Sequence, residues 1–132
     1  MLGLADIRDW IKTLDTGAEN YYIGRLDAKK DKSIGVYSLN NTSAAAIALG
    51  GDETTKTAVK GVSILIHWNK NARETETAAF GVFEKMMFKS NFDIKDTHVN
   101  YVRLLSAEPI DVGNGADLVY ERVIQAEFYY ER

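Results

Sequence analysis

The chain has 132 residues and a formal net charge of −3, which fits one domain and gives no sign of the basic stripe of nucleic-acid-binding proteins. A hydrophobic fraction of 45% predicts a core of ordinary size, and the lack of cysteine excludes disulfides, a thiolate nucleophile and a cysteine zinc site. The first residues lack the pattern of a signal peptide and no apolar run approaches the ~18 residues of a membrane span, so we expect residues 1–132 to form one cytosolic domain with no membrane partner.

A helix is predicted close to the N-terminus. Four apolar residues recur there at the spacing of a single helix face: Ile7, Trp10, Ile11 and Leu14. Gly17 is expected to end this helix, because glycine readily adopts the left-handed conformation of a helix C-cap.

Two strands are predicted next, at residues 21–26 and 33–39, which are rich in aromatic and branched side chains. The run between them, residues 27–32, reads Asp-Ala-Lys-Lys-Asp-Lys and has the chemistry of a turn. The two strands are therefore expected to form a β-hairpin. We interpret the lysines as part of a solvated turn rather than a nucleic-acid patch.

The centre of the chain predicts a strand followed by a helix. Residues 44–49 are ambiguous between a short strand and a helical turn, whereas residues 58–68 predict a strong strand with both faces partly covered. Asn71 and Glu74 have the spacing of a helix capping box. The helix that follows is expected to end at Asn91. Its apolar stripe, which predicts core packing, consists of Ala79, Phe80, Phe83, Met86 and Met87.

The last third of the chain predicts two strands joined by a loop. Residues 97–107 form the first strand, and Pro109 should mark its end or an edge position. Residues 111–117 contain two glycines and are expected to be a loop. Residues 118–131 alternate most clearly, so we expect one buried and one solvated face.

The order of these elements predicts the fold class. It reads helix, two strands, an uncertain strand, a strand, a helix and two strands, and the expected hairpins at both ends favour antiparallel pairing. We therefore expect an α+β fold, in which a mainly antiparallel sheet carries both helices on one face.

No pattern of catalytic or ligand-binding residues emerges from the sequence. The only histidines are His67, within a predicted strand, and His98, at the start of another. A hydrogen-bonded sheet residue and a surface residue are the expected roles. Gly113 and Gly115 lack the spacing of a phosphate loop and precede a strand. We therefore expect no catalytic, metal-binding or cofactor-binding residues, and a protein that is not an enzyme.

Several segments, taken in order, resemble one protein family. They are residues 22–26 (YIGRL), 32–37 (KSIGVY), 62–71 (VSILIHWNKN), 110–113 (IDVG) and 125–132 (QAEFYYER). Between them lies a helix that carries Glu76, Ala79 and Phe83. Together they make the chain similar to the minor capsid proteins of siphophages that infect Gram-positive bacteria. That group resembles the tail terminator and tail completion proteins of long-tailed bacteriophages, and the similarity covers nearly the whole chain.

The resemblance implies a virion structural protein at the tail–head junction, present in the host cytoplasm during assembly. It implies a homo-oligomeric ring, with a hexamer expected, that caps the tail tube and joins it to the head. The implied partners are further copies of the chain, the tail tube protein and the head–tail connector protein. DNA would pass through the lumen without specific binding, and an acidic lumen would suit this passage because it repels phosphates.

Charged loops are natural places for contacts between neighbouring subunits, although each of them is as well explained as a solvated loop. The expected interface residues are Asp27, Lys29, Lys30, Asp52, Glu53 and Lys56. Two other functions stay open on the sequence alone. One is another neck component, a stopper or an adaptor, and the other is a small non-enzymatic protein-binding α+β module.

Overall fold

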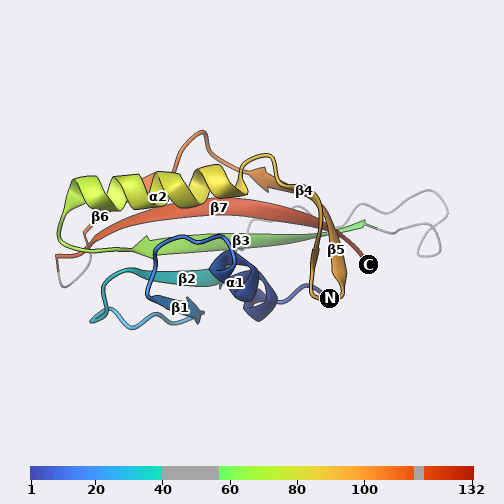
Figure 1. Cartoon of the computed structure of the whole chain (residues 1–132), viewed down its shortest axis with the longest axis horizontal. Helices are drawn as coiled ribbons and strands as arrows, with labels where there is room; N and C mark the ends of the chain where they lie inside the picture. The colour runs from blue at the N-terminus through green and yellow to red at the C-terminus, as the bar shows by residue number, and fades with distance from the viewer. Residues whose placement is uncertain (40–56, 115–117) are drawn as a thin grey trace.

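The computed structural model describes residues 1–39, 57–114 and 118–132. Within these residues it has an α+β fold, with two helices and seven strands in one sheet (Figure 1). The helices are α1 (Leu4–Lys12) and α2 (Ala72–Met86). The strands are β1 (Asn20–Ile23), β2 (Ser33–Ser38), β3 (Thr57–His67), β4 (Ser90–Ile94), β5 (Thr97–Leu104), β6 (Ile110–Asn114) and β7 (Tyr120–Glu131). No helix in these described ranges has the length and apolar character needed to cross a membrane.

The sheet is built around β3 and β7, which pair antiparallel over their whole length from Thr57↔Glu131 to His67↔Glu121. The strand order is β1-β2-β3-β7-β5-β4, so β1 and β4 lie at opposite edges. The free side of β7 is shared, since β6 pairs with its first part and β5 with its last part. All pairings are antiparallel except that of β1 with β2.

Both helices pack on the same face of the sheet, as the sequence predicts. Figure 1 shows α2 running along β7 and β3, with α1 beside β2. The alternating side chains of the central strands meet the helices there, and Ile64 faces Ile124 directly across the β3–β7 pair. Fully buried members of this core are Ile7, Ile11, Ile34, Val36, Val62, Ile64, Ile66, Ala79, Val82, Met86, Val99, Ile124, Ala126 and Phe128.

The helix ends agree with the sequence in part. The side chain of Asn71 caps α2 by accepting hydrogen bonds from the backbone N–H groups of Arg73 and Glu74. The Glu74 carboxylate accepts from the Asn69 side chain at 2.6 Å, instead of completing a capping box. Helix α1 ends at Lys12, before Gly17, and α2 ends at Met86, before Asn91, so both helices are shorter than predicted.

The predicted β-hairpin at residues 21–39 is wrong, because β1 and β2 run parallel, with Tyr21 beside Ile34 and Ile23 beside Val36. Polar turn residues indicate where a strand ends, but they do not determine whether the next strand pairs with it antiparallel or parallel. Here residues 24–32 are long enough to carry the chain back to the start of β1 (Figure 1). The backbone N–H of Lys32 donates to the Trp68 carbonyl at 2.6 Å, next to the antiparallel pairing of β2 with β3, so β2 lies between β1 and β3.

Two strands were not predicted. Residues 90–94 precede the expected strand at 97–107 and form a tight hairpin with it, and residues 110–114 form a strand in place of the expected loop. Neither carries an alternating buried pattern, since four of the five residues of β4 and all of those of β6 are half-buried or exposed. Each pairs with a longer strand, β4 with β5 and β6 with β7. Hydrogen bonding to that neighbour, rather than a buried face, therefore makes each segment a strand.

The second face of the last strand is less uniformly solvated than predicted. Its apolar face is buried as expected, at Ile124, Ala126 and Phe128. On the opposite face, however, Glu127 is only 3% exposed, and it accepts hydrogen bonds from Arg103 at 3.3 Å and from the Tyr129 hydroxyl at 3.0 Å. The polar face of β7 is therefore a packed polar surface at this point.

Candidate interaction surface

The connection between β1 and β2, residues 24–32, packs on the sheet face that the helices leave uncovered. At Gly35, an added Cβ would lie 2.9 Å from the Tyr37 ring and 3.3 Å from the Leu26 side chain, so both side chains cross the strand where glycine provides room. The Leu26 backbone is also hydrogen-bonded to the Tyr37 hydroxyl, and burial raises the pKa of Tyr37 above its usual value. The connection is thus packed against the sheet.

His67 secures the same connection from the end of β3. The ring is 2% exposed, with Nδ1 2.8 Å from Glu121 Oε2 on β7 and Nε2 3.0 Å from the Ala28 carbonyl oxygen. Both partners are acceptors when Glu121 is ionised, so both contacts are hydrogen bonds at once only when both ring nitrogens carry a hydrogen. The prediction that His67 is a hydrogen-bonded sheet residue is confirmed, and its role is to hold a segment 39 residues away.

A hollow of about 510 Å³ opens in this connection. It is lined by Tyr22, Arg25, Leu26, Asp27, Ala28 and Lys29. Apolar groups form much of the wall, and the His67 contact to Ala28 fixes one side of it. Among the described residues, the Arg25 and Lys29 side chains make no ion pair. The site therefore combines an apolar wall with the cations of Arg25 and Lys29 and the carboxylate of Asp27.

The residues predicted to form subunit contacts fall in two places. Asp27 and Lys29 line the hollow, and Lys30 follows them in the same exposed turn. The Asp27 carboxylate accepts the backbone N–H of Lys29 at 3.0 Å, so it shapes the turn as well as its surface. Asp52, Glu53 and Lys56 lie outside the described residues. The structure therefore brings three of the six together.

Beyond this connection, no helix of the described chain covers the second sheet face. Its centre is the Glu127–Arg103 pair, beside which the Tyr101 and Tyr129 rings stack with centroids 4.4 Å apart. Burial raises the pKa of Tyr129, so its hydroxyl remains a donor to Glu127 at neutral pH. Towards β6, the exposed apolar side chain of Ile110 is 38% accessible. This face is a mixed aromatic and polar surface, which is the composition of many protein–protein contacts.

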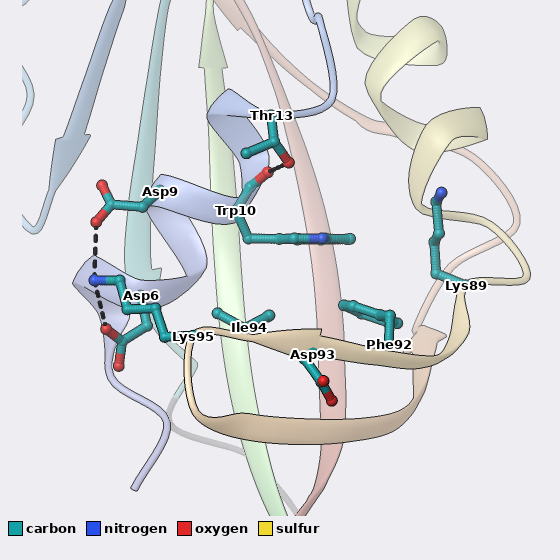
Figure 2. A pocket seen from close by; sticks show the side chains of 9 residues that line it. All are labelled: Asp6, Asp9, Trp10, Thr13, Lys89, Phe92, Asp93, Ile94 and Lys95. Atoms are coloured by element: carbon teal, nitrogen blue, oxygen red, sulfur yellow. Dashed lines mark hydrogen bonds and ion pairs between the residues drawn. The ribbon is translucent and has the colours of Figure 1, made fainter.

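A second hollow, of about 410 Å³, lies between α1 and the β4–β5 hairpin (Figure 2). Trp10 stacks on Phe92 at 4.9 Å and meets Phe128 edge-on at 5.6 Å. On its rim, Lys95 bridges the carboxylates of Asp6 and Asp9 at 3.0 and 3.1 Å. The aromatic stack and the ion pairs join the helix to the hairpin, so this hollow is the seam between two structural elements.

This seam predicts a specific acid sensitivity. The Gly3 N–H and then the Lys95 ammonium hold the pKa of Asp6 below its ordinary value. The stability gained from ionised Asp6 is therefore present above the unfolded pKa of about 3.9 and is lost as the pH falls through the folded pKa. Between about pH 5 and 2.5, we expect the free energy of unfolding to fall more steeply in the wild type than in Asp6→Asn, measured by urea unfolding. Equal slopes would contradict this role.

The histidines and carboxylates of the described residues form small, separate groups. Within residues 1–39, 57–114 and 118–132, no three His, Asp or Glu side chains converge as a metal site would require. His98 is half-buried at the β4–β5 hairpin, where its Nδ1 lies 2.8 Å from Asp93. His67 lies beside Glu121 and His98 beside Asp93, so the two histidines lie in separate groups.

Comparison with known proteins adds no identification. No family model matches the chain, and a search of curated proteins found no match.

Sequence reasoning missed the hollow, because the residues that build it are linked through long-range contacts. Ala28 and His67 are far apart in the chain, and so are His67 and Glu121. The one local signal was Gly35, a glycine inside an otherwise branched and aromatic strand, which often marks a close approach of another group.

Proposed function

We propose that this chain is a structural subunit of a bacteriophage particle, a tail terminator that forms the head–tail joining ring. The observation that carries the proposal is the sheet face that no helix of the described residues covers, on which the connection between β1 and β2 presents a basic surface with a hollow. In residues 24–32, Arg25, Lys29, Lys30 and Lys32 outnumber Asp27 and Asp31, giving a formal charge of +2 in a chain of −3. Such a surface suits contact with another protein.

A ring also requires two different contact surfaces on each subunit, since head-to-tail assembly joins unlike patches. The fold supplies unlike edges, with the short parallel strand β1 at one and the β4–β5 hairpin at the other. The sequence resemblance to minor capsid proteins agrees with such an assembly. We further propose the tail tube protein and the head–tail connector protein as partners, and a role that involves no catalysis.

The decisive experiment removes the protein from the particle. We expect the phage that encodes this chain to make heads and overlong tails that fail to join when the gene is deleted, as judged by negative-stain electron microscopy. Supplying the chain in trans should restore normal tail length. Filled heads with unjoined tails of normal length would indicate a stopper or adaptor instead. Normal virions without the protein would exclude the whole class of neck proteins.

A further inference from the structure

One apolar side chain is displayed in a way that the stability of the described chain does not explain. Phe88 follows the C-cap residue of α2, Met87, and its side chain is 90% exposed. Its φ of +62° lies in the left-handed region. Glycine or asparagine is usual at this position of a helix end, because a bulky side chain there costs free energy. The chain therefore holds a phenyl ring in water at a site where glycine would fit better.

The hollow in the β1–β2 connection has the complementary properties. Its volume of about 510 Å³ is ample for a phenyl ring, and Tyr22, Leu26 and Ala28 supply apolar contacts. Arg25, Lys29 and Asp27 also line it, and a cation is attracted to the face of an aromatic ring. Because Ala28 is tied to His67, the hollow is already formed before anything enters it, which lowers the cost of binding.

Phe88 and the hollow lie at opposite edges of one molecule. Phe88 precedes β4 at one edge of the sheet, while the hollow adjoins β1 at the other. Figure 1 shows the α2–β4 connection at the upper right and the β1–β2 connection at the lower left. A contact between them must therefore join two copies. The copy that inserts its Phe88 keeps a free hollow, and the copy that receives it keeps a free Phe88. Such a contact repeats from copy to copy and closes only as a ring.

We propose that Phe88 of one copy inserts into the hollow of the next, where it packs on Leu26 and under the cations of Arg25 and Lys29. This inference rests on the proposed function in that it supplies the contact by which the subunits assemble. An inserted aromatic side chain in a preformed pocket is typical of the few residues that dominate binding energy. The occupant is a second copy of this chain, because the same molecule carries both complementary parts.

The first test is Phe88→Gly, which separates assembly from stability. The thermal unfolding midpoint should stay equal or rise, since glycine accepts the backbone conformation at this position without strain. Self-association, measured by sedimentation velocity over a concentration series, should weaken at least tenfold. Asn91→Gly is the matched control, because Asn91 also has a positive φ, of 51°, and is exposed three residues away. Asn91→Gly should associate like the wild type.

The second test uses the absence of cysteine from the chain. Lys89→Cys and Lys30→Cys in one chain, treated with a short bis-maleimide, should give a ladder of covalent oligomers that extends beyond dimers. Each single variant should stop at dimers, and adding Phe88→Gly should remove the ladder. No ladder at any concentration, or a ladder unchanged by Phe88→Gly, overturns the inference. Deletion phenotypes of the phage report on the proposed function separately, so rings without this cross-link would overturn only the contact.

Discussion

Replacement of Phe128 by alanine is expected to lower the free energy of unfolding by about 3–5 kcal/mol, the range for truncating a buried aromatic side chain. Phe128 is fully buried towards the C-terminal end of β7, where its ring lies at a right angle to that of Trp10. It therefore joins the central strand to α1 and the β4 seam. Because domains of this size are stable by only about 5–15 kcal/mol, the variant should be close to unfolding at physiological temperature.

Urea unfolding followed by circular dichroism measures this loss. Phe88→Ala is the control, since it removes the same ring from an exposed site and should change stability by no more than about 0.5 kcal/mol. Phe128→Leu keeps most of the apolar volume and should fall between the two. A loss below about 1 kcal/mol in Phe128→Ala would contradict the central place of this residue in the core.

The contrast between these two phenylalanines also shows what sequence could predict. Phe128 stands in a strand whose apolar residues alternate over its whole length, and β7 follows that pattern in register with β3. Phe88 lies outside the helical stripe that precedes it, because it is one residue beyond Met87 and two beyond Met86 rather than three or four. Helix α2 ends at Met86, and Phe88 itself has a left-handed backbone conformation that directs its side chain to solvent. Where the periodic pattern and the backbone agree, sequence predicts burial well.

The candidate site shows the opposite case. The placement of β2 beside β3 includes the bond from Lys32 to Trp68, and the hollow is built with the contact between His67 and Ala28. Each of these contacts joins residues more than 30 positions apart, so no local sequence pattern predicts them. Asp27 and Lys29 were predicted as interface residues because they lie in a charged loop of a chain whose resemblance implies a ring. The hollow that they line became visible only when the connection was placed on the sheet.

The His67 contacts therefore set the second large prediction. His67→Ala is expected to lower the free energy of unfolding by about 1–3 kcal/mol, because it removes two hydrogen bonds and leaves the Ala28 carbonyl without its ring partner. His98→Ala is the matched control, since His98 pairs with Asp93 at the surface and should cost no more than about 0.5 kcal/mol. Urea unfolding of both variants measures the difference.

The same variant tests whether the core of the sheet shapes the surface of the hollow. Freed from His67, the connection between β1 and β2 should open more often, so the backbone amides of Lys29 and Lys30 should exchange hydrogen faster than in the wild type. A double-mutant cycle with Glu121→Ala should give a coupling of about 1 kcal/mol with His67.

If the amide exchange is unchanged while stability falls, His67 supports the sheet without organising the hollow. If both change together, the central strands hold the contact surface in its binding shape, and self-association should weaken in the same variant although Phe88 is intact.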